Sequence, residues 1–281
     1  MFVDSDDELA PGTIEAAMKT MEEDEACDIA EFGVLRVSRS SDDKEERACS
    51  KPVDGSCSNK PLFLEGELVF DPQTVSEPHY ADMRLYWLRT RAYTHSYAWN
   101  KIYRRWLFQD VRYPVGRVFE DMFTLPKLLL RAKRLRIMPH GCYIYHINSS
   151  GITAHADHDA SMTAVLLTAS MEAWRVLDID NAPRAERKLQ DLYYMHILNI
   201  QITTYLLGCK QSVASKHGLM FQHGETSQQG EASPKSVVLP MRRVVPWRLP
   251  RRFVLKAFAL HLLGVEGVCK LFSCLKAKRS L

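Results

Sequence analysis

The sequence predicts an α/β protein in which a mixed sheet with helices is followed by a mainly helical C-terminal region. An acidic turn at 4–7 precedes apolar residues at helical spacing, and residues 29–37 then alternate as in a strand. Two further short strands are predicted at 135–138 and 142–147, and helical patterns prevail from Met162 onward. A length of 281 residues allows one large domain or two small ones.

The start of the chain has the pattern of a strand, an acidic turn, a helix and a second strand. Phe2 and Val3 are expected to end a buried strand. Pro11 suits the first turn of the helix that follows. The apolar face of that helix comprises Ile14, Ala17, Met18 and Met21. Residues 38–61 are polar and charged, and we expect them to form a long loop or an insertion.

The middle of the chain is rich in aromatic residues and contains two predicted helices and a short strand. We expect a helix at 84–93 and a strand at 98–103, followed by a turn at 114–116. A helical pattern of apolar residues begins at Glu120, and Pro126 is expected to restrict that helix to a first turn or to kink it.

The C-terminal part is predicted to consist of helices at 162–177 and 186–207 and a basic helical tail after Pro250. These patterns divide the chain into two predicted domains. Residues 1–155 contain the predicted sheet, and residues 156–281 form a helical region with a basic amphipathic tail.

The composition is that of an ordinary globular protein, with 46% hydrophobic and 25% charged residues. A net charge of +3 lacks the strong basic excess of a dedicated nucleic-acid binder, so no nucleic-acid partner is expected. The seven cysteines form no Cys-x-x-Cys pair, which favours reduced thiols over a disulfide scaffold or a zinc ribbon. Neither a secretory signal nor an uninterrupted apolar span is evident, and a cytoplasmic location is predicted.

The two ends of the chain differ in charge. The first fifty residues hold fifteen acidic and five basic residues, whereas eight basic residues and one acidic residue lie from Arg248 onward. The basic tail has a broad apolar face made of Val254, Phe258, Leu262, Val265, Cys269 and Phe272. Two interpretations stay open for this tail: peripheral contact with the inner face of a membrane, or packing of its helix against the rest of the protein.

The acidic turn is the strongest local signal for chemistry. Asp4, Asp6 and Asp7 form an oxygen-rich cluster that a hard divalent cation, Mg²⁺ or Mn²⁺, can neutralise together with phosphate oxygens. The alternative is a solvated turn whose aspartates cap the following helix, and the spacing alone does not separate the two.

A second carboxylate pair, Glu120 and Asp121, opens the apolar helix after the turn at 114–116. The helix dipole favours an ionised carboxylate at this position, which suits a general base. Many helices begin with acidic residues, and by itself this pair indicates no more than a helix start.

Several segments in the same order along the chain resemble family 2 of the glycosyltransferases. The acidic turn with Leu9 and Pro11 resembles the metal motif of that family. Trp-Asn-Lys-Ile-Tyr-Arg-Arg at 99–105 is similar to its Trp-Asn-Lys-Leu-Tyr-Arg-Arg segment. The match continues with Pro-x-Gly at 114–116, Glu-Asp at 120–121, and segments at 128–134, 143–145 and 151–153. The resemblance covers residues 1–153.

The resemblance implies a nucleotide-diphospho-sugar transferase fold of the GT-A type, with 1–155 as the C-terminal part of the catalytic domain. It implies inverting transfer of a sugar from a nucleotide-sugar donor to a saccharide or lipid-linked saccharide, in the synthesis of a bacterial surface polysaccharide. The residues to which it gives roles are Asp4, Asp6 and Asp7 for the donor and its Mg²⁺ or Mn²⁺, Asp121 as general base with Glu120 beside it, and Trp99, Asn100 and Lys101 on the acceptor side.

The chain departs from the family at its start. The family has several βα units for the nucleotide before the acidic motif, and here the motif begins three residues after Met1. We therefore expect that these 281 residues alone will not transfer a sugar. A non-catalytic module that binds a partner or a membrane is the alternative function. A phosphatase of the haloacid-dehalogenase type is disfavoured because Glu8 stands where that family has Thr or Val.

Overall fold

The computed structural model describes residues 1–38, 66–148 and 159–216, together with scattered positions between 254 and 271. The predicted loop at 38–61 lies outside the described residues, apart from Ser38, and so does most of the basic tail. The chain divides into two compact units, Met1–Tyr113 with Thr124–Ser150, and Pro114–Phe123 with Gly151–Leu281. Each unit is described by itself below.

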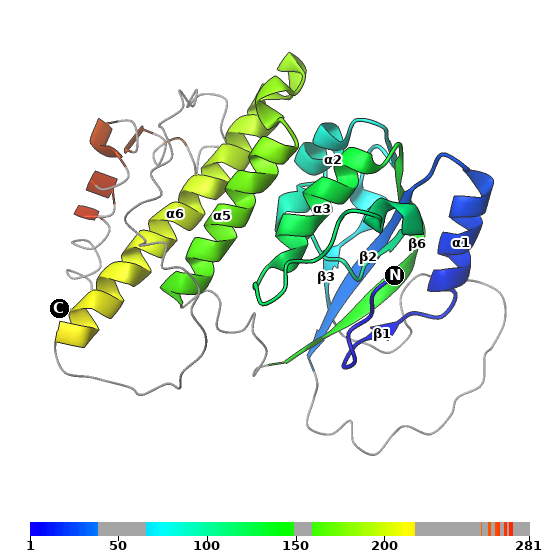
Figure 1. Cartoon of the computed structure of the whole chain (residues 1–281), viewed down its shortest axis with the longest axis horizontal. Coiled ribbons are helices and arrows are strands. Elements are labelled where there is room, and N and C mark those ends of the chain that lie inside the picture. Colours follow the sequence, from blue (N-terminus) through cyan, green and yellow to red (C-terminus); the bar gives the residue numbers. More distant parts are fainter. Residues whose placement is uncertain are drawn as a thin grey trace. The chain divides into compact units, whose positions relative to one another are not determined.

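The first unit is built on one mixed sheet (Figure 1). Among the described residues its strands are β1 (Glu8–Leu9), β2 (Ile29–Ser38), β3 (Gly66–Phe70), β4 (His79–Tyr80), β5 (Lys101–Tyr103) and β6 (Leu135–Ile147). The main order is β1-β6-β2-β3, with β4 paired to β6 and β5 paired to β2. β2 and β6 are parallel and the other pairs are antiparallel. The predicted α/β class is therefore confirmed, as a mixed sheet.

β6 replaces the two short strands predicted at 135–138 and 142–147. Its register with β2 shifts between Glu31 and Gly33, so the irregularity is absorbed as a bulge and the strand continues. Gly141 lies in this part of β6 with a φ of +94°, a backbone conformation that L side chains rarely adopt. The residues between the two predicted strands, 139–141, therefore belong to one long strand.

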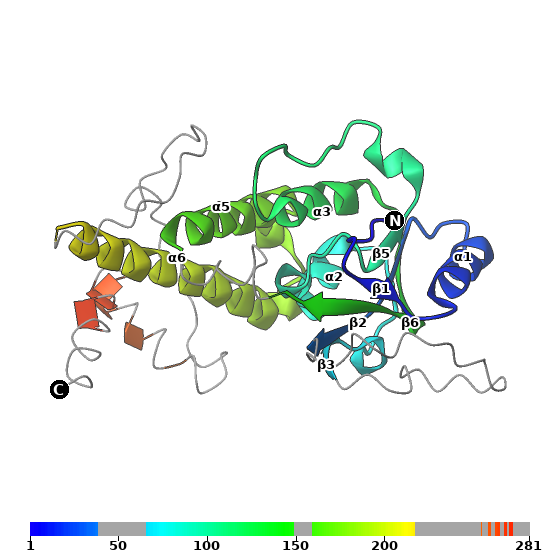
Figure 2. The same cartoon turned by 90° about the horizontal axis from the view of Figure 1, so that it is seen from below.

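Helix α1 (Thr13–Glu23) covers part of the sheet (Figure 2). Of its predicted apolar face Ala17 and Met21 are buried, but the prediction is wrong for Ile14 and Met18, which are 52% and 46% exposed. Ala17 and Met21 pack in a buried cluster with Ala30 and Phe32 of β2. Helix α1 starts after Gly12, which has a φ of +78°.

The prediction that Phe2 and Val3 end a buried strand is wrong. Both side chains are exposed, by 41% and 49%, and the first strand begins only at Glu8. The pairing of β1 with Ile144 and Tyr143 of β6 decides where this strand forms, and the turn at 4–7 precedes it.

The aromatic middle of the chain forms shorter elements than predicted. Helix α2 (Met83–Arg89) ends near a 3₁₀ turn (Ala92–Thr94), and β5 spans only Lys101–Tyr103. The first unit has further 3₁₀ turns at Pro72–Thr74 and Arg105–Phe108. The second unit has 3₁₀ turns at Ile179–Asn181 and Arg184–Glu186. Helix α3 (Glu120–Arg131) contains Pro126 and continues to Arg131, with Leu128 and Leu129 fully buried.

The second unit contains two helices that run side by side in both views, α5 (Ala160–Val176) and α6 (Arg187–Lys216) (Figures 1 and 2). The hydroxyl of Tyr193 donates to the Ser170 carbonyl at 2.9 Å, and the Tyr193 ring stacks on Trp174. The predicted helical C-terminal region is thus confirmed, and α6 is longer than the predicted 186–207.

Described positions of the tail contact α6. Val268 is fully buried in a cluster with Met195 and Leu198, and Val254 packs against the same cluster. Phe258 and Leu262 are exposed, by 53% and 74%. Of the two interpretations of the tail, packing against the protein is supported at these positions. None of the helices in the described part of the chain has the length and apolarity needed to cross a bilayer.

Candidate functional site

The acidic turn is held against β6 by hydrogen bonds to Asp7. One carboxylate oxygen of Asp7 accepts the Tyr143 hydroxyl at 2.9 Å, and the other accepts the backbone N–H of His146 at 2.8 Å. The backbone N–H of Asp4 donates to the same Tyr143 oxygen at 3.1 Å, and Asp7 N–H donates to the Asp4 carbonyl. Asp7 therefore orients the turn.

Glu8 and His146 add a second contact between the turn and β6. The imidazole Nε2 of His146 lies 3.3 Å from a carboxylate oxygen of Glu8. Because Glu8 also pairs with β6 through its backbone, the turn is attached to β6 on both sides of Asp7.

The carboxylates of the turn differ in what they offer to a cation. Asp4 and Asp6 are exposed, whereas both oxygens of Asp7 accept hydrogen bonds from the protein. In the described residues no three His, Cys, Asp or Glu side chains gather as a metal site. Mg²⁺ commonly uses one or two carboxylates together with substrate phosphates. The exposed Asp4 and Asp6 suit that kind of site, and Asp7 is held in place by the protein.

Tyr143 also connects the turn to Trp99. Its ring stacks on the indole with centroids 4.1 Å apart, and Tyr97 stacks on the same indole at 4.3 Å. Tyr145 lies parallel at 5.8 Å. Trp99 is thus fixed in a stack, with a half-buried side chain.

Burial raises the pKa of the Tyr143 hydroxyl well above its usual value, and the hydrogen bond to Asp7 acts in the same direction. The hydroxyl therefore keeps its proton and donates to Asp7.

Asn100 and Lys101 lie in the interior beside Glu31 of β2. The Lys101 ammonium is 2.9 Å from Glu31 Oε1, and neither side chain is exposed. Asn100 donates to the same oxygen at 3.3 Å and to the Phe32 carbonyl at 3.1 Å. Tyr86 donates to the other oxygen of Glu31 at 2.9 Å. Of the three residues assigned to the acceptor side by the resemblance, only Trp99 has a partly exposed side chain.

His95 borders this buried group. Its Nε2 lies 3.9 Å from Glu31 Oε1, and its ring stacks on Phe70. Burial lowers the pKa of His95 to about 4, an effect that Glu31 opposes and that Lys101 and Arg91 reinforce. The imidazole is neutral at pH 7.

Glu120 and Asp121 form the first turn of α3, directly after Phe119, which has a φ of +57°. Glu120 is exposed and Asp121 is half-buried. Both residues belong to the second unit, and the acidic turn belongs to the first. The structure thus describes the surroundings of each carboxylate group separately.

Two residues that organise this site are not marked as such by the sequence. Tyr143 stands in a segment that resembles the family, and Glu31 stands in the strand predicted at 29–37. A signal for Glu31 existed: a charged residue in the centre of an apolar strand needs a buried partner. No comparable local signal marks Tyr143, since its contacts with Asp4, Asp7 and Trp99 are with residues far away in the sequence.

No protein-family model matches this chain, and no curated protein is significantly similar to it.

Proposed function

We propose that the chain carries the acidic turn and the general base of an inverting glycosyltransferase. Such an enzyme transfers a sugar from a nucleotide-sugar donor to a hydroxyl of a saccharide or lipid-linked saccharide. The observation that supports the proposal is the position of Tyr143, which bonds to Asp7 through its hydroxyl and stacks on Trp99 through its ring. Tyr143 therefore joins three segments on which the family resemblance depends: the acidic turn at 4–7, the segment at 99–105 and its own segment at 143–145.

In this proposal the exposed Asp4 and Asp6 bind the donor diphosphate through Mg²⁺ or Mn²⁺. When bound, the cation supplies charge neutralisation for the departing nucleoside diphosphate. Tyr143 and His146 hold the turn in place through Asp7, so the two exposed carboxylates keep their orientation.

Asp121 is the proposed general base, which takes the proton from the acceptor hydroxyl as that oxygen attacks the anomeric carbon. Its position in the first turn of α3 favours the ionised carboxylate that this role requires. Glu120 is its neighbour.

The test compares Asp121→Asn with Asp110→Asn, which makes the same change at an exposed aspartate that pairs with Arg131. Each variant is assayed for nucleoside diphosphate release from a panel of nucleotide sugars. Because the family has nucleotide-binding units before its acidic motif, each assay is run on the chain and on the chain joined to any segment encoded in frame before Met1.

Loss of a general base lowers a rate by about 10²- to 10⁴-fold. We expect that loss for Asp121→Asn, with donor binding retained, and an unchanged rate for Asp110→Asn. Equal rates for the two variants would remove Asp121 from the mechanism. Absence of transfer in both forms of the chain would contradict the proposed function itself.

One observation favours the alternative of a non-catalytic interaction module. β3 is the end strand of the main order in the described residues, and it exposes Leu68 by 45% and Val69 by 37%. Exposed strand edges with apolar side chains are sites for pairing with another chain. Leu68→Lys should then reduce self-association or partner binding in sedimentation experiments, whereas Ile14→Lys, a change at an exposed position of α1, should not.

A further inference from the structure

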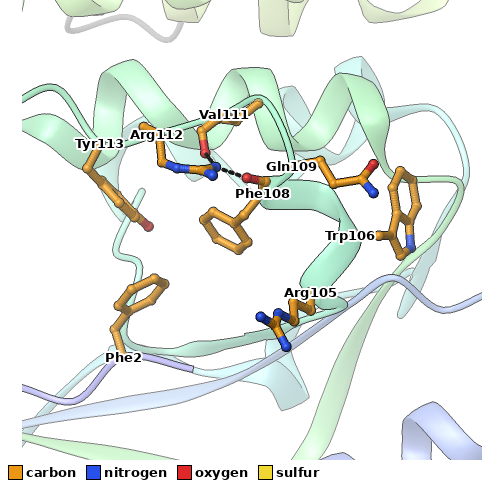
Figure 3. Close-up of a pocket in the computed structure, with 8 residues that line it drawn as sticks. All are labelled: Phe2, Arg105, Trp106, Phe108, Gln109, Val111, Arg112 and Tyr113. Atoms are coloured by element: carbon orange, nitrogen blue, oxygen red, sulfur yellow. Dashed lines mark hydrogen bonds between the residues drawn. The ribbon is translucent and has the colours of Figure 1, made fainter.

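The first unit has a hollow of about 740 Å³ on the side of β5 that leads into the 3₁₀ turn Arg105–Phe108. This volume is large enough to hold a small molecule. The rings of Phe2, Phe108 and Tyr113 face one space, and the guanidinium of Arg105 reaches toward it from another direction (Figure 3). Trp106, Gln109, Val111 and Arg112 complete the lining.

The aromatic side chains that line the hollow pack against one another. Phe2 meets Tyr113 edge to face with centroids 5.3 Å apart and meets Phe108 in the same manner at 5.8 Å. Tyr103 supports this group from the adjoining strand, at 5.4 Å from Phe108. The Phe2 and Trp106 side chains are nevertheless 41% and 38% exposed. The hollow thus presents apolar ring surface to solvent.

Two polar side chains of the hollow, Arg105 and Gln109, are exposed and take no part in the contacts of the fold. Within the part of the chain that the structure describes, the Arg105 guanidinium and the Gln109 side-chain amide have no hydrogen-bond or ion-pair partner. The nearest acidic residue in the sequence, Asp110, pairs instead with Arg131 at 3.4 Å. Arg112 donates to the Phe108 and Val111 carbonyls. The positive charge of the hollow is therefore not balanced by a carboxylate of its lining.

We propose that this hollow binds a phosphorylated sugar, and that it holds the acceptor of the proposed transfer reaction. The apolar C–H faces of a sugar ring suit exposed aromatic rings, and its hydroxyls suit the Gln109 amide. A phosphate group suits an arginine that has no carboxylate partner. The role of this ligand as acceptor rests on the proposed function. Its phosphate group is inferred from Arg105 alone.

Binding is measured by calorimetry on the full chain with glucose 1-phosphate, glucose, inorganic phosphate and uridine monophosphate. We expect glucose 1-phosphate to bind more tightly than the other three. Arg105→Gln should weaken its binding by about tenfold or more, because a charge-assisted hydrogen bond is lost. Trp106→Leu should also weaken it. Arg89→Gln is the matched control, since Arg89 is an arginine of α2 that pairs with Glu77 and does not line the hollow.

Equal binding of glucose 1-phosphate to Arg105→Gln and Arg89→Gln would overturn the proposal, and so would tighter binding of uridine monophosphate or of phosphate alone. Circular dichroism melts of each variant check that the fold is kept. Binding to phosphatidylcholine vesicles that carry polyprenyl-phosphate glucose, but not to plain vesicles, would assign the sugar phosphate to a lipid carrier. Binding only in solution would assign it to a soluble one.

The outcome is separable from that of the transfer assay. Sugar-phosphate binding that depends on Arg105 in a chain without transferase activity would refute the proposed reaction and keep the hollow as a binding site. Transfer that is unaffected by Arg105→Gln would refute the role of the hollow and keep the reaction.

Discussion

The ammonium of Lys101 lies 2.9 Å from a carboxylate oxygen of Glu31, and both side chains are completely buried. Each ion has further partners. Asn100 and Tyr86 donate to the carboxylate, and the ammonium donates to the Asn100 side chain and the Tyr97 carbonyl. The pair joins β5 to β2 directly after the stacked Trp99. A buried pair of this kind is costly to break, because the remaining ion has no compensating charge.

Lys101→Met should therefore lower the free energy of unfolding by about 3–5 kcal/mol. Adding Glu31→Gln should recover part of the loss, since the unpaired charge is removed. Urea denaturation followed by fluorescence measures both changes. Arg36→Met is the control: Arg36 pairs with Glu67 between β2 and β3, but both side chains are largely exposed, and a loss of about 1 kcal/mol or less is expected. Similar losses for Lys101→Met and Arg36→Met would contradict this account.

His95 should make stability fall in acid. Its pKa is about 4 in the folded protein and about 6.5 when unfolded, so between these values the unfolded chain binds a proton that the folded chain does not. Stability due to this group is therefore unchanged above pH 6.5 and declines as the pH drops toward 4, by about 3 kcal/mol in total.

The measurement for His95 is the free energy of unfolding against pH for the natural chain and for His95→Gln, which does not titrate. The difference between the two should shrink steadily from pH 6.5 to pH 4.5. A difference that is independent of pH would show that His95 is protonated alike in both states.

Tyr143→Phe should lower the free energy of unfolding by about 1–3 kcal/mol, because the carboxylate of Asp7 and the Asp4 N–H both lose a partner. The ring and its stacking on Trp99 are retained. Combining this change with Asp7→Ala in a double-mutant cycle isolates the hydrogen bond, and the two losses should be less than additive. Strict additivity would mean that the hydroxyl and the carboxylate act separately.

Gly141→Ala should be more harmful than Gly12→Ala. Both glycines have positive φ values, +94° and +78°, so both substitutions impose backbone strain of about 1–2 kcal/mol. At Gly141 an added Cβ would also lie 3.1 Å from the Thr13 side chain, whereas at Gly12 it would meet nothing within 4 Å. Thermal unfolding of the two variants measures the difference, and equal melting temperatures would argue against the close contact.

Elements defined by local periodicity could be predicted from the sequence. β2, α3 and α5 follow their apolar spacing, since one face of each is buried. What local patterns could not predict depends on distant partners. Phe2 and Val3 look like a strand, but β6 pairs with Glu8 and Leu9 instead. Lys101 looks like a surface residue of an acceptor site, and only its contact with Glu31 explains its burial.

The long strand β6 has a consequence for how the polypeptide reaches its native state. It bonds to segments that are synthesised much earlier, with contacts that join positions as many as 139 apart. During translation β1, α1 and β2 leave the ribosome well before their central partner exists. Topologies with many such long-range contacts fold slowly, and the segments that are not yet paired are prone to aggregate. Successful expression of this chain should therefore depend on low temperature and on chaperones that shield nascent strands.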